Sequence, residues 1–272
     1  MASLMSPWPY PRVLAHRGGG AFAPENTIAA IRTGRERGFR GVEFDVTLSA
    51  DDEPVLMHDP TLDRTTDASG PVAGRSWAEL ARLDAGRWFS PGFAGEPIPR
   101  LSDALGYCRS NQVWVNAEIK PAPGAEQRTG ERVARAIARD FADPMQHAVG
   151  PDGPPDPRLP LLSSFSADAL AAARDAAPWL PRGLLCRRIP ANWRDQLQRL
   201  QCVALHCDHR TLDALGAAQV RGAGFWLFCY TVNDRQRAIE LAQWGVDALC
   251  TDRLDLIEPT LLDSSDSPLP LS

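Results

Sequence analysis

Several features that mark particular classes of protein are missing from this sequence. No apolar run approaches the roughly 18 residues that a membrane-spanning helix needs. The first twelve residues, MASLMSPWPYPR, lack the basic start and apolar core of a secretory signal. No basic stripe is present that could neutralise phosphates, and the net charge of −5 gives no reason to expect nucleic acid as a partner.

The cysteines do not form a recognisable framework either. There are six, none in CxxC spacing, and several lie within apolar segments that resemble strands: Cys108, Cys186, Cys202, Cys207, Cys229 and Cys250. We therefore expect buried, reduced thiols rather than disulfides or zinc ligands.

What the sequence does contain is typical of one large α/β domain. Its 272 residues can bury a sizeable core without disulfides or metals. Short apolar runs predict strands at 13–16, 41–48, 54–58, 113–119, 161–165, 183–186, 202–206, 225–232 and 248–251. Helical patterns lie between most of them, at 27–37, 125–141, 167–176, 212–219 and 234–245. Repeated strand–helix order predicts parallel strands, and this many units favours a closed, TIM-type (β/α)8 barrel.

One pair of predicted strands breaks the alternation. Gly41–Leu48 and Pro54–His58 are too close in sequence for a crossover helix, so we expect an antiparallel hairpin around Ala50–Glu53. With a four-residue turn, Asp45 would lie directly opposite His58 and share its face.

The remaining segments set the domain boundaries. We expect a single domain over residues 11–258, with flexible tails at 1–10 and 259–272. The Gly- and Pro-rich stretch at about 60–100 should be an insertion over one end of the barrel, containing a short helix at Ser76–Leu83. A further loop is expected at Gly150–Pro160.

Polar side chains interrupt the strands at particular points. Glu43 and Asp45 are two residues apart and therefore point to one face of an extended strand, and Glu118 and Lys120 repeat this spacing. The residues that we expect near one barrel mouth are His16, Glu43, Asp45, His58, Glu118 and Lys120. Active sites of such barrels lie at the carboxyl ends of the strands.

These residue types make a coherent chemistry. Three carboxylates without an accompanying cysteine form a hard-oxygen set suited to Mg²⁺ or Ca²⁺, and a divalent ion there could bind a phosphodiester oxygen. Two histidines allow one to take a proton and the other to supply one. Arg17 and Lys120 could offset remaining negative charge.

Each residue alone has a simpler explanation. A histidine or acid at a strand end is usually a solvated or hydrogen-bonded loop residue, and Glu-x-Asp is common on exposed strands. Here, however, the alternating residues Val42, Phe44 and Val46 are apolar, which indicates a sheet covered by helices on its other face. Acids that face into a barrel need partners, because unpaired buried charge is costly. The set as a whole favours a functional site.

The same residues fall into an ordered series of motifs. They are HRGGGAFAPENT (16–27), VEFDV (42–46), VLMHDPTLDRTT (55–66), NAEIK (116–120), SSF (163–165), YTVN (230–233) and TDRLD (251–255). This order, from about Leu14 to Ile257, resembles the glycerophosphodiester phosphodiesterase family, and LDAGRWFSPGFAGEPIPRL resembles that family's insertion. Single pieces are weak signals, but the ordered set is highly specific.

The resemblance implies a TIM-type barrel that hydrolyses glycerophosphodiesters to sn-glycerol 3-phosphate and an alcohol. It implies Glu43, Asp45 and Glu118 as ligands of one divalent cation, either Mg²⁺ or Ca²⁺, with Mn²⁺ as a further candidate. His16 and His58 would be the acid–base pair. Whether a neighbouring glycerol hydroxyl attacks first, giving a cyclic phosphate, is left open.

The resemblance also implies residues that contact the substrate. Arg17 and Lys120 would contact the phosphate, and Phe165 and Tyr230 would line the glycerol or alcohol side. Tyr230 stands where a tryptophan is expected before TVN, which alters the shape of that wall.

Several assignments stay open or secondary at this point. Asn26 is either a cap of the first helix or a ligand, and Asp252 is expected to be structural. The missing signal and the resemblance together suggest a cytoplasmic enzyme that scavenges phospholipid breakdown products. The alcohol group and the oligomeric state, including a homo-oligomer, are left open.

Three alternatives keep the same barrel. A phospholipase D-like enzyme acting on lysophospholipids would need an apolar entrance, which Trp88, Phe89 and Phe93 could supply unless they only pack the insertion onto the barrel. A metal-independent phosphoinositide lyase would leave the three carboxylates without a purpose. A non-catalytic phosphoglycerol-binding barrel would be expected to have lost a histidine or an acid, and none is missing.

Overall fold

The strands close into a barrel. A computed structural model describes residues 7–141 and 156–263. Within these ranges eight parallel strands occur: β1 (Val13–Ala15), β2 (Gly41–Leu48), β4 (Trp114–Ile119), β5 (Leu161–Ser164), β6 (Arg182–Cys186), β7 (Ala204–Asp208), β8 (Trp226–Tyr230) and β9 (Ala248–Thr251). Their order is β1-β9-β8-β7-β6-β5-β4-β2, and pairing of β1 with β2 closes the ring. The predicted TIM-type barrel is therefore confirmed.

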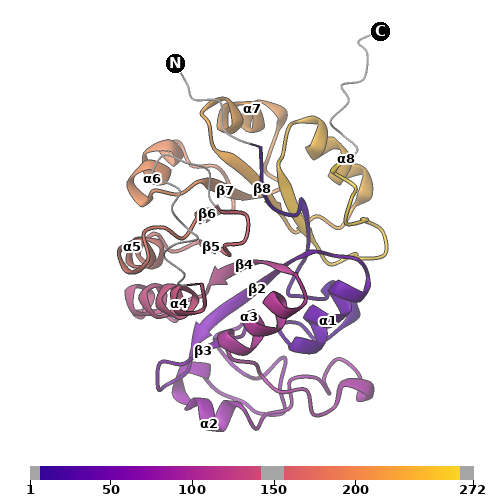
Figure 1. Cartoon of the computed structure of the whole chain (residues 1–272), viewed down its shortest axis with the longest axis vertical. Helices are drawn as coiled ribbons and strands as arrows, with labels where there is room; N and C mark the ends of the chain where they lie inside the picture. Colours follow the sequence, from indigo (N-terminus) through magenta and orange to yellow (C-terminus); the bar gives the residue numbers. More distant parts are fainter. Residues whose placement is uncertain (1–6, 142–155, 264–272) are drawn as a thin grey trace.

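Helices follow most of the strands and surround the barrel (Figure 1). They are α1 (Ile28–Glu36), α3 (Leu101–Ser110), α4 (Glu126–Asp140), α5 (Ala167–Ala176), α6 (Trp193–Leu200), α7 (Ala214–Gly222) and α8 (Arg235–Gln243). The sequence patterns did not predict α3 and α6. Helix α6 has a narrow apolar stripe, with Trp193, Leu197 and Leu200 buried at helical spacing among charged residues. None of the described helices is long and apolar enough to cross a membrane.

Side chains that alternate along the strands form two separate apolar cores. Outward-facing residues such as Val42, Phe44 and Leu205 pack under the helices. Inward-facing residues at the amino ends of the strands, among them Trp114 and Trp226, fill the floor of the barrel. The six cysteines are all free, and five of them are buried, as expected from the sequence.

The segment before β1 contributes to this floor. Trp8 and Tyr10 fall within the stretch 1–10 that we expected to be flexible, yet Tyr10 is buried and stacks on Trp114 with ring centroids 4.2 Å apart. Trp8 packs edge-on against Trp226 at 5.3 Å. Residues 1–6, 142–155 and 264–272, which include most of the predicted tails and part of the predicted 150–160 loop, lie outside the described residues.

The predicted hairpin is present, but its predicted register is wrong. Strand β3 (Pro54–Leu56) pairs antiparallel with β2, and Leu48 lies opposite Pro54. In this register Asp45 lies opposite Met57, whose backbone N–H donates to the Asp45 carbonyl oxygen at 3.1 Å. The connection has five residues, from Ser49 to Glu53, and Asp52 within it takes a left-handed conformation with φ 65°. A shift of one residue reverses the face on which a side chain lies, so His58 does not oppose Asp45.

The insertion after β3 forms a lobe with its own small core, at the lower end of Figure 1. The predicted short helix is shorter than expected, α2 (Trp77–Leu80), and a capping box between Ser76 and Glu79 starts it. Single 3₁₀ turns occur at Gly20–Phe22, Val72–Gly74 and Pro91–Phe93. The lobe is tied to the barrel by Glu96, whose carboxylate accepts the N–H of Ala29 at 2.8 Å.

Candidate active site

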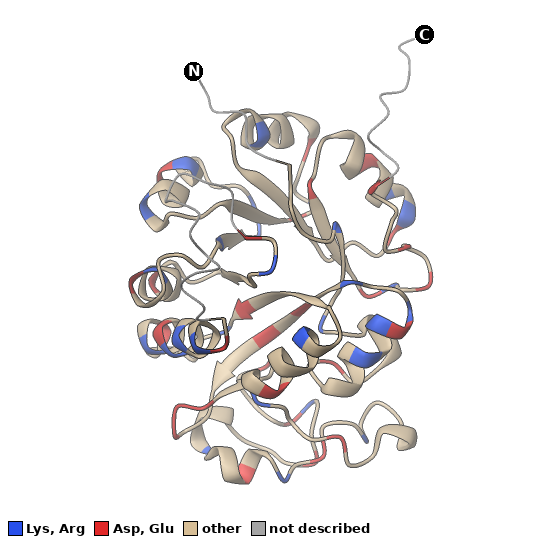
Figure 2. Ribbon diagram, viewed as in Figure 1, with Lys and Arg blue, Asp and Glu red and all other residues tan. Residues whose placement is uncertain are grey.

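The polar residues expected at one barrel mouth do meet there. Glu43 and Asp45 lie on β2, Glu118 lies on the adjacent β4, and His16 directly follows β1. Asp45 and Glu118 are register partners in the sheet. Figure 2 shows acidic positions, in red, on the strands that Figure 1 labels β2 and β4. They come together because β1, β2 and β4 are neighbours and run in the same direction.

Three carboxylates form the centre of this site. One oxygen from each of Glu43, Asp45 and Glu118 lies within 4.8 Å of the other two. Burial and the charge of Asp45 raise the pKa of Glu43 to about 7 and that of Glu118 to about 8. The pKa of Asp45 is lowered instead, because Arg17, His58 and Lys120 outweigh the opposing effect of its burial. The negative charge of three ionised carboxylates would therefore exceed the positive charge of the residues around them.

The nearby cations do not fully satisfy these acids. Lys120 Nζ lies 3.3 Å from Glu118 Oε1 and 3.8 Å from Asp45 Oδ1. Glu118 Oε1 is buried and has no partner in hydrogen-bonding geometry. An oxygen in this situation has a lone pair available for a metal ion.

His16 is held by an acid from the far end of the sequence. Its Nδ1 donates to Asp252 Oδ1 at 2.6 Å, and its Nε2 faces Glu43 Oε2 at 3.8 Å. Asn233 donates to the second oxygen of Asp252 at 2.9 Å. Burial lowers the pKa of His16, but Asp252 and Glu43 outweigh it, so the pKa is raised. With Nδ1 occupied, Nε2 is the nitrogen that can meet a substrate.

His58 is held in the same manner by its neighbour in sequence. Its Nδ1 donates to Asp59 Oδ1 at 2.6 Å, and Arg64 Nε donates to Asp59 Oδ2 at 2.6 Å. The pKa of His58 is lowered, first by burial and then by the charges of Arg17 and Lys120, against Asp45 and Asp59. Each histidine is thus oriented by an acid that accepts a hydrogen bond from its Nδ1, but the pKa of His16 is raised and the pKa of His58 is lowered.

Asn26 does not cap the first helix; both polar groups of its side chain bind Asp45. Its side-chain amide donates to Asp45 Oδ2 at 2.8 Å, and its amide oxygen accepts the N–H of Asp45 at 2.9 Å. Thr27 caps α1 instead, accepting the N–H of Ala30 at 3.0 Å. Asn26 has φ 59°, a conformation that asparagine tolerates better than most residues. The double hydrogen bond fixes the orientation of the Asp45 carboxylate.

Arg17 is fixed on one side of the carboxylate cluster. Its Nη1 donates to Glu25 Oε1 at 2.7 Å, while Arg64 also donates to Glu25. Its Nε is buried without a hydrogen-bond partner and lies 3.6 Å from Asp45 Oδ2. Arg17 has φ 50°, an unfavourable conformation of the kind that often occurs in functional sites.

The two aromatic residues that we expected to line the substrate lie side by side. Phe165 follows β5 and is 46% exposed, and Tyr230 ends β8. Their rings pack edge to face with centroids 5.9 Å apart. The Tyr230 hydroxyl donates to the Cys186 carbonyl oxygen at 2.8 Å, so it is already engaged.

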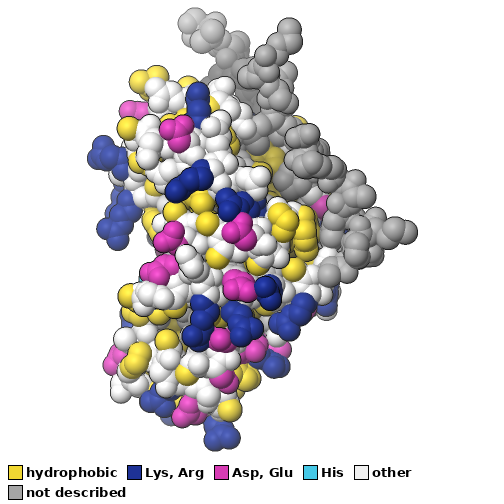
Figure 3. Space-filling model, turned by 90° about the vertical axis from the view of Figure 1, so that its left-hand side faces the viewer, with side chains coloured by type: hydrophobic (Ala, Val, Ile, Leu, Met, Phe, Trp, Pro, Cys, Tyr) yellow, Lys and Arg dark blue, Asp and Glu magenta, His cyan; other side chains and the backbone are white. Residues whose placement is uncertain are grey.

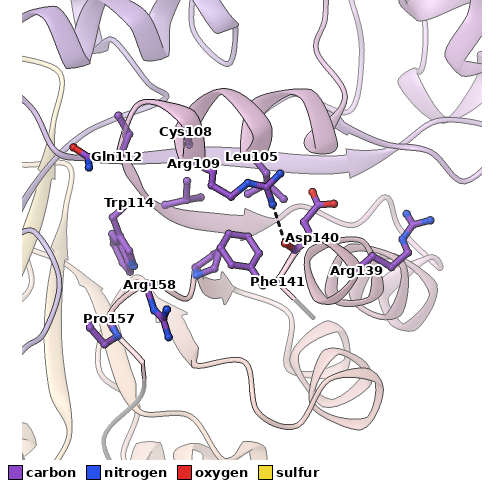
Figure 4. A pocket seen from close by; sticks show the side chains of 13 residues that line it. Leu105, Cys108, Arg109, Gln112, Trp114, Arg139, Asp140, Phe141, Pro157 and Arg158 are labelled. Atoms are coloured by element: carbon purple, nitrogen blue, oxygen red, sulfur yellow. Dashed lines mark hydrogen bonds between the residues drawn. The ribbon is translucent and has the colours of Figure 1, made fainter. Parts of the chain in front are cut away.

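Two cavities are relevant to the position of the site. One of about 500 Å³ adjoins His58, Glu118 and Lys120. A larger one of about 680 Å³ lies at the other end of β4, beside Trp114 and Arg109, where Arg109 donates to the Asp140 carbonyl oxygen (Figure 4). Because none of the residues at the barrel mouth lines the larger cavity, we place the site at the smaller one.

Sequence reasoning missed the acids that orient the histidines. Asp252 was expected to be structural, and Asp59 was assigned no role. The position of Asp59 directly after His58 was an available signal, since adjacent residues can bond when the chain turns at a strand end. Nothing in the spacing indicated Asp252, which is 236 positions from His16 in sequence.

Comparisons with known proteins agree with this arrangement. Residues 16–256 match the sequence model of the glycerophosphoryl diester phosphodiesterase family. A glycerophosphodiester phosphodiesterase of Caldanaerobacter subterraneus subsp. tengcongensis is 32% identical over 246 residues, which is 88% of this chain and 93% of that protein. A phosphodiesterase of Oleispira antarctica, solved in complex with the product sn-glycerol-3-phosphate, is 33% identical with a TM-score of 0.80, covering 94% of this chain and 97% of that one. The glycerophosphodiester phosphodiesterase of Agrobacterium tumefaciens is 28% identical with a TM-score of 0.72, covering 90% and 97%.

Proposed function

The chain belongs to the glycerophosphoryl diester phosphodiesterase family of hydrolases, and we propose that it is a metal-dependent enzyme that releases sn-glycerol 3-phosphate and an alcohol. The observation that carries this proposal is the cluster of Glu43, Asp45 and Glu118, which two oriented histidines flank. The product complex of the Oleispira antarctica relative supports the choice of product.

The donor set fits a hard divalent cation. Glu43, Asp45 and Glu118 offer carboxylate oxygens, the ligands that Mg²⁺ and Ca²⁺ prefer. The pKa values of Glu43 and Glu118 are raised by burial first and then by the charge of Asp45, and a cation at the cluster would offset both effects. The ion would supply Lewis-acid polarisation of a phosphodiester oxygen.

The histidines supply proton transfer. Because Asp252 and Asp59 hold the Nδ1 atoms of His16 and His58, the Nε2 atoms are the ones available to substrate. One Nε2 accepts the proton of the attacking oxygen, whether from the neighbouring glycerol hydroxyl or from water. The other donates a proton to the leaving alkoxide. This kind of catalysis contributes about 10²–10⁴ in rate.

The phosphate would be held by the two cations beside the cluster. Arg17 Nε is a buried donor with no hydrogen-bond partner, so a phosphate oxygen could take that place. Lys120 Nζ, close to Glu118, adds positive charge on the opposite side of Asp45. Phe165 and Tyr230 would lie along the ester substituents.

A direct assay tests the proposal. Chelator-stripped protein is incubated with glycerophosphocholine or glycerophosphoethanolamine, with Mg²⁺, Ca²⁺ or Mn²⁺ added back, and glycerol 3-phosphate is measured with a coupled dehydrogenase. We expect ion-dependent release that Glu43→Gln and His16→Gln reduce by at least about 10². Glu131→Gln, an exposed change on α4, is the matched control and should leave the rate unaltered. Folded protein that releases no product with any ion would refute the proposal.

Hydrolysis of lysophospholipids remains the alternative prediction. Trp88, Phe89 and Phe93 in the insertion pack edge to face on one another, with centroids 5.7 and 5.6 Å apart. Trp88 is nevertheless 40% exposed. Release of an alcohol from an acylated substrate, with none from glycerophosphocholine, would favour this alternative.

A further inference from the structure

The cavity of about 500 Å³ beside the active site has two different parts. At one side it is bounded by His58, Glu118 and Lys120, where the phosphate would react. Elsewhere its walls are mostly apolar and come from the insertion, at Val72–Ala73, and from the β4–α4 connection, at Pro121–Pro123. A phosphodiester bound at the carboxylates would therefore extend one of its two ester substituents between these walls.

The two serine hydroxyls along this cavity are already engaged within the protein. Ser164 Oγ donates to the Ile119 carbonyl oxygen at 2.7 Å. Ser166 Oγ accepts the N–H of Ala169 at 3.1 Å and thereby caps α5. Glycerol needs hydrogen-bond partners for its free hydroxyls when it leaves water. With apolar walls and both serines engaged, the cavity fits the alcohol half of the substrate better than the glycerol half.

Glu126 provides an uncompensated negative charge in the wall. It is the first residue of α4, and its carboxylate accepts the N–H of Gly124 at 3.1 Å. In the described parts of the chain it forms no ion pair, because the arginines that follow it, Arg128 and Arg132, pair with Asp52. A carboxylate beside apolar walls favours a cation whose substituents are themselves apolar.

An aromatic ring completes the wall. Phe165 lines the same cavity and is almost half exposed, while Tyr230 packs against it edge to face. The face of an aromatic ring attracts alkylated ammonium groups, which have little hydration to lose.

We propose that this cavity is the subsite for the leaving alcohol and that Glu126 and Phe165 select alcohols bearing a positively charged, alkyl-substituted nitrogen. The proposal rests on the proposed function, since it assigns the alcohol half of that same substrate. Methyl groups on nitrogen would contact the proline and alanine walls, and the charge would face the Glu126 carboxylate.

The test compares two substrates that differ by one atom. Glycerophosphocholine is compared with the 3,3-dimethylbutyl ester of glycerol 3-phosphate, in which a neutral carbon replaces the charged nitrogen. Both release glycerol 3-phosphate, so one assay serves for both. We expect kcat/KM to favour glycerophosphocholine by roughly tenfold. Glu126→Gln should lower that preference roughly fivefold, through the KM for glycerophosphocholine, and change kcat/KM for the neutral ester less than about twofold.

Controls separate selectivity from folding. Glu131→Gln, on the same helix, should change neither substrate. Glu126 also lies at the N-terminus of α4, where a carboxylate stabilises the helix. A drop in kcat/KM that is equal for both substrates, together with a lower Tm, would show a structural role only and overturn the proposal.

The remaining outcomes distinguish the two proposals. Equal hydrolysis of both substrates by the unaltered enzyme and by Glu126→Gln would overturn the subsite while leaving the proposed function intact. Hydrolysis of neither substrate with any ion would refute the proposed function and the subsite together. Glu126→Lys should reverse the preference, so that the neutral ester becomes the better substrate.

Discussion

The two ends of the barrel are built from opposite kinds of side chain. At the amino ends of the strands, Tyr10, Trp114 and Trp226 pack ring against ring into an apolar floor. At the carboxyl ends, Glu43, Asp45 and Glu118 are buried close together although their charges repel. Packing at the amino ends therefore stabilises the fold, whereas the repelling carboxylates at the carboxyl ends destabilise it. The fold is stabilised at the end where no chemistry occurs.

The outer surface is a third environment. On the face formed by α4, α5 and α6, basic and acidic side chains are interspersed, as Figure 3 shows for the described residues. Pairs such as Arg135–Glu131 and Arg174–Asp175 contribute to this mixture. Exposed pairs of this kind each contribute little to stability, so the contrast between the two ends dominates.

The largest effect is expected at the floor. Trp226→Ala should lower the free energy of unfolding by about 3–5 kcal/mol, because it removes a ring that is buried between Trp8 and Tyr10. The kcat of the protein that remains folded should not change. Urea denaturation and activity at low temperature measure the two quantities separately. Trp88→Ala, at a half-exposed tryptophan of the insertion, should cost much less. A Trp226→Ala protein with a lower kcat but unchanged stability would contradict the division between a stabilising floor and a catalytic mouth.

The next largest effect is a loss of stability with rising pH, caused by the carboxyls at the barrel mouth. The pKa values of about 7 for Glu43 and about 8 for Glu118 exceed the ordinary value of 4.5. Between about pH 4.5 and 8 these two carboxyls therefore bind more protons in the folded protein than in the unfolded chain, so their contribution to stability falls as the pH rises. The raised pKa of His16 acts in the same direction. The metal-free protein should lose on the order of a few kcal/mol over this window.

Two comparisons sharpen this prediction. Saturating Mg²⁺ or Ca²⁺ should restore most of the lost stability at pH 8 and little at pH 5, as measured by urea denaturation. Glu118→Gln should flatten the pH dependence of the metal-free protein. If the free energy of unfolding depends on pH equally in the unaltered protein and in Glu118→Gln, the carboxyls at the mouth do not destabilise the folded protein.

A smaller effect is expected at Asp252, which orients His16 from the side facing away from the substrate. Asp252→Asn should lower kcat about 10- to 100-fold with KM nearly unchanged, because the amide no longer fixes the His16 tautomer. Since Asp252 helps to raise the pKa of His16, the limb of the pH–rate profile that reports His16 should move to lower pH. Asp255→Asn, at an exposed acid on the same segment, serves as the control. A kcat within twofold of the unaltered enzyme would mean that Asp252 does not position His16.

Sequence patterns could predict the barrel and most of its mouth for a physical reason. Strand β2 and helix α5 were predicted with their observed ends because apolar periodicity and sharp polar boundaries define both. The predicted hairpin register was wrong because it depended on the length of the turn, which has five residues instead of the four that were assumed. Asn26 was left open between a helix cap and a ligand because the sequence could not show that its side chain bonds Asp45 across the barrel mouth. The role of Asp252 could not be predicted because this residue follows β9, and only closure of the barrel brings β9 beside β1 and His16.

The smallest effect is expected between the two ends, at His206. This side chain points into the barrel from β7, is fully buried, and has no hydrogen-bond partner in the described structure at either ring nitrogen. Burial lowers its pKa to about 3, so it is neutral near pH 7. It stacks on Phe228 with centroids 4.5 Å apart, and its ring occupies the space above Gly183, where a Cβ would come within 2.5 Å of Nε2.

A neutral, unpaired imidazole in this position contributes packing but leaves two polar atoms unsatisfied. Leucine keeps much of the apolar contact and removes those atoms, so His206→Leu should raise stability by about 1 kcal/mol or leave it unchanged, with kcat unaltered. His206→Ala should lower stability, because it leaves a cavity beside Phe228. Urea denaturation of the two variants gives the comparison. Destabilisation of His206→Leu by more than about 1 kcal/mol would show that the imidazole is hydrogen-bonded, for example to enclosed water. The polar character of the mouth would then extend below the carboxylates toward the aromatic floor.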